Sequence, residues 1–72
     1  MEMSQPATIT LNGAEHPIEG TVTIERLLES IGLIGKPVVV ELNEQAIFPR
    51  DYSQTMVELG ARVEIVALAA GG

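Results

Sequence analysis

Apolar and polar residues alternate in two short segments within residues 7–18, and Asn12-Gly13 separates the two segments. A two-residue period is typical of a half-buried β-strand, and Asn-Gly is the strongest short signal for a type I′ hairpin turn. The predicted turn places Ile9 opposite His16, with both side chains on one face of the hairpin. Pro17 has no amide hydrogen, so the second strand is predicted at an edge of the sheet.

A helical period replaces this alternation after Thr23. Apolar residues recur at i, i+3, i+4 and i+7, which predicts one buried helix stripe made of Ile24, Leu27, Leu28 and Ile31. Thr23 suits the N-cap position, and Glu25 in the first turn complements the helix dipole. Gly32 suits the residue that follows the helix, where a left-handed conformation is common.

Three later segments predict further strands. Val38–Asn43 is rich in β-branched residues and predicts a central strand, and Ala46–Phe48 predicts a short strand that Pro49 ends. Arg62–Ala67 predicts the last strand, and its inward residues are expected to be Val63, Ile65 and Ala67. Residues 50–60 are expected to be irregular, with one helical turn near residues 51–53.

These elements predict an α+β fold, in which one main helix covers one face of a mixed sheet of four to five strands. If the first and last strands are neighbours, they run parallel in the middle of the sheet, which is the β-grasp arrangement of ubiquitin. We expect a single domain over residues 1–72, with residues 1–6 as a loose lead-in and residues 68–72 as a mobile tail.

Composition and charge exclude several classes of function. The 72 residues contain four basic and ten acidic side chains, for a net charge of −6, and no cysteine. Nucleic-acid binding needs a basic surface, and disulfides, thiolate metal sites and cysteine nucleophiles need cysteine. The chain contains no apolar run long enough for a membrane span, and its first residues do not resemble a signal peptide. We therefore expect a cytoplasmic protein that binds neither nucleic acid nor membrane.

The chain ends in Ala69-Ala70-Gly71-Gly72, after a strongly β-prone segment. Glycine has no Cβ, so a terminus of this kind can enter a narrow slot and deliver its α-carboxylate to another protein. That carboxylate is ionised at neutral pH, with a usual pKa of roughly 3.5, and it must be activated before it can acylate anything. The sequence thus predicts a reactive C-terminus at Gly72, with Gly71 giving clearance.

Taken together, the motifs resemble the thiamine-biosynthesis sulfur carrier family, ThiS, over nearly the whole chain. The residues that carry this resemblance are Thr23–Leu28, Val38–Asn43, Phe48-Pro49-Arg50, Val63–Val66 and Gly71-Gly72. The order and spacing of these segments are more specific than any one of them alone.

The resemblance implies a carrier protein rather than an enzyme. A ubiquitin-activator-like adenylating enzyme would use ATP to convert the Gly72 carboxylate to an acyl adenylate. A sulfur donor system of the cysteine desulfurase type would then supply sulfur for a thiocarboxylate, and a thiazole synthase would take that sulfur. The carrier itself is expected to hold no cofactor and no metal ion.

Other polar residues have ordinary interpretations. His16 is the only histidine, so a metal site is not expected, and Lys36 has no predicted burial that would favour a general base. Solvated charges are expected at Glu15, Glu19, Glu25 and Glu29. Apolar residues on the outward face and in the tail predict a partner-binding surface beside the terminus, made of Val39, Phe48, Val66, Leu68, Ala69 and Ala70.

Three alternatives share the same pattern. The small subunit of molybdopterin synthase has the same fold and terminus, but its relatives tend to have a Pro-Pro turn near the end, and residues 65–72 contain no proline. The chain could also be a ubiquitin-like modifier of lysines. The third alternative is a β-grasp binding module whose terminus has no chemical role.

Overall fold

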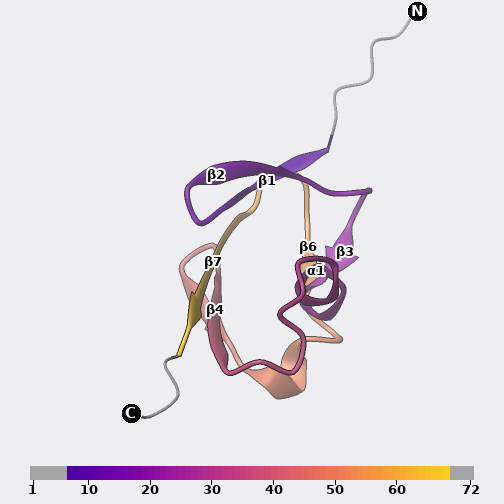
Figure 1. Cartoon of the computed structure of the whole chain (residues 1–72). Helices are drawn as coiled ribbons and strands as arrows, with labels where there is room; N and C mark the ends of the chain where they lie inside the picture. The colour runs from indigo at the N-terminus through magenta and orange to yellow at the C-terminus, as the bar shows by residue number, and fades with distance from the viewer. Residues whose placement is uncertain (1–6, 69–72) are drawn as a thin grey trace, which may run out of the picture.

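The computed structural model describes residues 7–68 of the chain, and it begins with the predicted hairpin (Figure 1). Strands β1 (Thr8–Leu11) and β2 (Ala14–Pro17) are antiparallel, with Ile9 opposite His16. Asn12 and Gly13 have φ angles of 51° and 83°, as a type I′ turn requires. Strand β2 lies at the edge of the sheet, so the missing amide hydrogen of Pro17 costs no hydrogen bond between central strands.

Helix α1 (Ile24–Ser30) begins and ends as the sequence predicts. The Thr23 hydroxyl oxygen accepts a hydrogen bond from the Arg26 amide at 3.0 Å, which caps the first turn. Ile31 is the C-cap residue and is half-buried, and Gly32 follows it with a φ of 76°. A left-handed glycine at this position ends the helix at little steric cost.

The main sheet has five strands in the order β2-β1-β7-β4-β5. The remaining three are β4 (Val38–Leu42), β5 (Gln45–Ile47) and β7 (Arg62–Ala67). Strand β7 runs parallel to β1 and antiparallel to β4, so the last strand lies in the middle of the sheet. A mixed sheet of this order with one helix across it is the β-grasp fold, as predicted from the sequence.

The core lies between the main sheet and α1, which face each other in Figure 1. The predicted helix stripe supplies three of its buried side chains, and β4, β7 and the short strand β6 (Met56–Val57) supply most of the others. The buried residues are Ile9, Ile24, Leu27, Leu28, Val40, Val57, Ala61, Val63 and Ile65. Within residues 7–68 no charged or polar side chain is buried among them.

A second, two-stranded sheet was not predicted. Strand β3 (Val22–Thr23) pairs antiparallel with β6 (Met56–Val57), and the Val57 side chain is fully buried. A strand of two residues is too short for an alternating pattern to appear in the sequence. The helical turn expected near residues 51–53 is a 3₁₀ helix that begins earlier and covers Pro49–Asp51.

One prediction about the last strand is wrong. Val63 and Ile65 are buried as expected, but Ala67 is exposed. Strand β1 pairs with β7 only at Arg62 and Val63, and the chain then turns away into the hairpin. The end of β7 therefore has β4 as its neighbour on one side and extends past the part of the sheet that covers the core.

Candidate functional site

The expected reactive terminus, Gly71-Gly72, and the adjoining Ala69-Ala70 lie outside the described residues. The last described residue, Leu68, follows β7 directly, and its amide donates a hydrogen bond to the carbonyl oxygen of Pro37 at 2.8 Å. This bond extends the β4–β7 ladder by one step beyond the strand itself. The terminal four residues are thus joined to a point that is fixed against β4.

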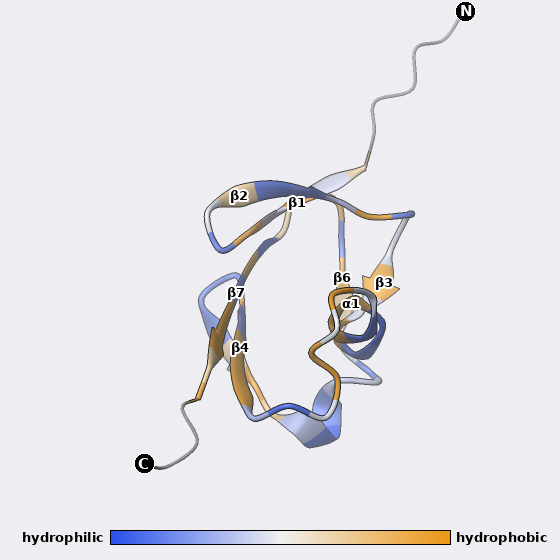
Figure 2. Cartoon of the chain, viewed as in Figure 1, coloured by the Kyte–Doolittle hydropathy of each residue, from blue (hydrophilic) through white to orange (hydrophobic). Residues whose placement is uncertain are grey.

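The four described members of the predicted partner surface lie on three neighbouring segments and are all exposed. Val39 on β4 and Val66 on β7 are directly opposite one another, with 41% and 60% of their surfaces exposed. Leu68 lies two residues after Val66 on the same face and is 50% exposed. Figure 2 shows the hydrophobic colouring of both strands toward this end. We call Val39, Phe48, Val66 and Leu68 the apolar patch.

Phe48 belongs to the same patch by register. Ile47 is the partner of Val40 across β5 and β4, so the next residue, Phe48, is carried to the level of Val39. Phe48 is 58% exposed. The Arg50 guanidinium carbon lies 5.3 Å from the ring centroid, within the range of a cation–π contact. A positive charge therefore borders the apolar patch.

Acidic residues border the patch on its other side. Glu41 on β4 lies directly opposite Glu64 on β7, two residue pairs along the ladder from Val39 and Val66 and on the same face of the sheet. Like charges in directly opposed positions destabilise a sheet, so this pair is not explained by stability. At the start of β7, Arg62 Nη1 lies 3.3 Å from Glu44 Oε2, in an exposed ion pair. The outward face thus has an apolar end next to Leu68 and a charged end away from it.

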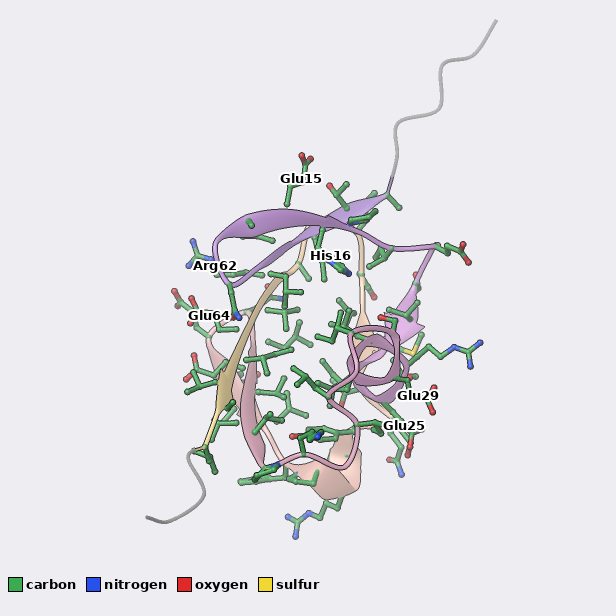
Figure 3. The ribbon with its side chains drawn as sticks, in the orientation of Figure 1. Glu15, His16, Glu25, Glu29, Arg62 and Glu64 are labelled. Carbon is green, nitrogen blue, oxygen red and sulfur yellow. The ribbon has the colours of Figure 1, made fainter. Side chains whose placement is uncertain are left out.

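The remaining sequence candidates do not come together as a catalytic site. His16 is half-buried, and its side chain extends from β2 toward α1 into a groove of about 480 Å³ (Figure 3). The four glutamates expected to be solvated are all exposed, and Figure 3 shows Glu15 directed away from the helix that carries Glu25 and Glu29. Lys36 is exposed in the loop before β4.

Among the titratable groups of residues 7–68, Tyr52 is the one whose pKa clearly departs from its ordinary value. Its ring packs against the core from the segment after the 3₁₀ helix, and burial raises the pKa of its phenol above the ordinary value of 10.0. The shift disfavours the phenolate only, so Tyr52 stays neutral at physiological pH. This residue supports the fold beside α1, where its carbonyl oxygen also accepts a hydrogen bond from the Glu25 amide at 3.1 Å.

Two further classes of site find no support in the part of the chain that the structure describes. Over residues 7–68, no three His, Asp or Glu side chains gather closely enough to hold a metal ion. None of the helical structure in that range is long and apolar enough to cross a membrane.

Sequence reasoning missed two features of this face. The Glu41–Glu64 pair needed the β4–β7 register, which no local pattern specifies. The contact between Arg50 and Phe48 had a weak signal, because Phe48-Pro49-Arg50 places the two side chains on either side of a proline. A turn at the proline can place the arginine side chain over the phenylalanine ring, but the sequence alone does not specify this geometry.

Comparison with known proteins agrees with this architecture. The model of the ThiS family matches residues 9–72, which is nearly the whole chain and includes its Gly-Gly terminus. The chain belongs to the ThiS family. The resemblance inferred from the sequence motifs is therefore confirmed.

Individual relatives extend this family assignment. The sulfur carrier protein ThiS of Thermus thermophilus is 39% identical over 64 residues, covering 89% of this chain and 98% of that protein. A thiazole synthase of Paramagnetospirillum magneticum is 34% identical over 64 residues, and the chain spans only 20% of its length.

Solved structures agree at the level of the fold. The crystal structure of thiamine biosynthesis protein ThiS from Geobacter metallireducens matches with a TM-score of 0.79 and 25% identity. That match covers 90% of this chain and 99% of the other. A solution structure of a thiamine biosynthesis protein from the same organism gives a TM-score of 0.74, 26% identity, and coverage of 90% and 87%.

Proposed function

We propose that this member of the ThiS family carries sulfur for thiamine biosynthesis on its C-terminal glycine and acts in the cytoplasm. The observation that carries the proposal is the family match over residues 9–72, which includes Gly71-Gly72. The fold adds physical support, since the chain leaves the sheet toward that terminus at Leu68, whose amide is bonded to Pro37 before β4. In this account the chain is the substrate of partner enzymes and binds no cofactor itself.

The chemistry at Gly72 proceeds in three steps. A carboxylate oxygen attacks the α-phosphorus of ATP in the adenylating partner, pyrophosphate leaves, and an acyl adenylate forms. A donor of the cysteine desulfurase type presents sulfur as a persulfide, and its terminal sulfur attacks the acyl carbon while the bond between that carbon and the AMP oxygen breaks. A thiol reductant then cleaves the S–S bond of the resulting acyl disulfide, which leaves a thiocarboxylate on the terminus, the donor cysteine as a thiol and the reductant as a disulfide. Gly71 keeps the approach to this carbon free of side chains.

The apolar patch serves as the docking surface beside the terminus. It lies on strands β4 and β7 and at the end of β5, directly before the chain continues into Ala69-Ala70. Four extended residues span about 13–14 Å, so a partner seated on the patch can hold Gly72 in a recessed active site. Arg50 and the Glu41–Glu64 pair frame the patch with opposite charges, and such an arrangement fixes orientation more than it adds affinity.

Thiazole synthase is proposed as the protein that receives the sulfur. The similarity to a thiazole synthase of P. magneticum supports this relationship, because a carrier-like segment forms about a fifth of that protein. The adenylating enzyme and the sulfur donor follow from the chemistry. A carboxylate must be activated before sulfur can replace its oxygen, and sulfur must arrive in nucleophilic form.

ATP–pyrophosphate exchange with the adenylating enzyme of the same organism tests the first step. Deleting Gly72 withdraws the carboxylate by about 3.5 Å, and a misplacement of about 1 Å can already cost roughly a hundredfold in rate. Exchange is therefore expected to disappear in the truncated chain and to persist in Glu44→Ala, a surface variant at the opposite end of β4 and β7. Exchange by the truncated chain at the parent rate would refute the proposal.

A further inference from the structure

The side chain of Asn12 contacts the last strand, β7, at Ile65, just beyond the point where β1 stops pairing with β7. The Ile65 amide donates to Asn12 Oδ1 at 2.7 Å, and Asn12 Nδ2 donates to the Ile65 carbonyl oxygen at 3.1 Å. The two residues are 53 positions apart in the chain. One side-chain amide thus supplies both the acceptor and the donor that a neighbouring strand would offer to Ile65.

This contact explains where the parallel ladder between β1 and β7 stops. The ladder runs through main-chain bonds from the Thr10 amide to the Ala61 carbonyl and from the Asn12 amide to the Val63 carbonyl, both at 2.9 Å. The hairpin turn then takes the main chain away from β7. The Asn12 side chain adds one more step, at Ile65, in place of the strand that is no longer there.

The next step on this side of β7 is Ala67, and its main-chain groups face an open edge. Main-chain groups of successive residues in a strand point to opposite sides, and the amide of Leu68 is directed to Pro37 on the β4 side. The amide and carbonyl of Ala67 therefore point the other way. Within residues 7–68 no strand lies beyond Asn12 on that side, and Ala67 is exposed.

We propose that Asn12 is a positioning residue that holds β7 at Ile65, so that the open edge of the strand at Ala67 is in place for an extended main-chain segment of the adenylating partner. Because Gly72 lies four residues after Leu68, a protein that acts on Gly72 must lie within about 13–14 Å of this edge. The same protein is therefore placed to continue the ladder that β1 leaves unfinished. This inference rests on the proposed function, since it assigns the edge to the enzyme that activates the terminus.

Asn43 is a matched control for Asn12, because its side chain contacts the start of the same strand, β7. Asn43 also lies in a two-residue turn, with a φ of 50° against 51° for Asn12, and its Oδ1 accepts from the Arg62 amide at 2.9 Å. Glycine tolerates both positive φ angles, so Asn12→Gly and Asn43→Gly each remove a side-chain clamp without straining the turn. Only Asn12 is next to the open edge.

Amide hydrogen exchange of the free protein tests the clamp. In Asn12→Gly, the exchange rate of the Ile65 amide is expected to rise about fivefold more than the loss of global stability alone would cause. A factor of this size corresponds to the loss of one hydrogen bond. In Asn43→Gly, exchange at Ile65 is expected to follow global stability alone. Equal exchange at Ile65 in both variants would overturn the positioning role.

Adenylation kinetics test the occupant of the edge. With the adenylating enzyme of the same organism, KM for the carrier is expected to rise about fivefold in Asn12→Gly and to stay at the parent value in Asn43→Gly, with kcat unchanged in both. A synthetic chain with an ester in place of the Ala67 amide removes the outward donor and leaves the bonds to β4 intact. It is expected to show the same rise in KM with an unchanged melting temperature.

The outcomes separate this inference from the function on which it rests. If the parent chain is adenylated but the Ala67 ester and Asn12→Gly keep the parent KM, the open edge has no role and the inference is wrong. If the parent chain is not adenylated at all, the proposed function fails first, and the assignment of the edge to that enzyme fails with it.

Discussion

Val39 and Val66 lie directly opposite each other on β4 and β7, and both side chains face outward on the side of the sheet away from α1. An exposed valine pair in the middle of a sheet adds little to folding, because water still reaches both side chains. Val66 lies two residues before Leu68 on the same face, and the pair forms the centre of the apolar patch. In the proposed function, a partner holds the strand that leads to the terminus at this pair.

A charge placed in this pair should weaken partner binding without unfolding the chain. Val66→Asp is expected to reduce affinity for the adenylating enzyme at least tenfold, because a buried, unpaired carboxylate costs several kcal/mol at an interface. Binding is measured by titration calorimetry, and stability by thermal melting. Thr21→Asp adds the same charge at an exposed position before β3 and should bind as the parent does. Equal affinities for both variants would show that the patch is not an interface.

The helix stripe predicts a large loss of stability when one of its residues is shortened. Leu28 is 1% exposed, so Leu28→Ala is expected to lower the free energy of unfolding by about 2–5 kcal/mol. In a domain of this size, each kcal/mol corresponds to roughly 4–8 °C in melting temperature. Glu29→Ala changes the exposed neighbour and should stay within about 0.5 kcal/mol of the parent. A normal melting temperature for Leu28→Ala would contradict the described core.

The phenol of Tyr52 predicts a loss of stability in alkaline solution. Burial raises its pKa in the folded chain above the ordinary value of 10.0, so the neutral phenol favours folding. This contribution is complete below the unfolded pKa and is lost as pH rises through the folded pKa. Tyr52 is the only tyrosine and tryptophan is absent, so ultraviolet absorbance follows its ionisation alone. A midpoint at or below 10.0 would contradict this prediction, and Tyr52→Phe should lack this component of the alkaline loss of stability.

Local sequence signals were sufficient for most of the fold. The Asn12-Gly13 turn, the Thr23 cap and the apolar helix stripe each depend on residues within a few positions of one another. Their periods and turn residues indicate the element types, and the β-grasp order follows once the first and last strands are taken as neighbours, as the structure has them. The ThiS family signal was also readable, because its motifs are spread over the whole chain in a fixed order.

The missed features depend on contacts between distant segments. Strands β3 and β6 contain two residues each, and their pairing is visible only when residues 22–23 and 56–57 are brought together. The exposure of Ala67 depends on where β1 turns away from β7. The clamp from Asn12 to Ile65 joins residues 53 positions apart, so the Asn-Gly signal predicted the turn but not what the asparagine side chain contacts.

The central claim is that Gly72 carries sulfur, and intact-protein mass spectrometry tests it most directly. The chain is incubated with ATP, the adenylating enzyme, a cysteine desulfurase with cysteine, and a thiol reductant, and then compared with a reaction lacking ATP. The account predicts an ATP-dependent mass increase equal to one sulfur replacing one oxygen, located at Gly72 by fragmentation. A covalent adduct to a lysine would identify a modifier instead, and an unchanged mass with an active adenylating enzyme would contradict the carrier function.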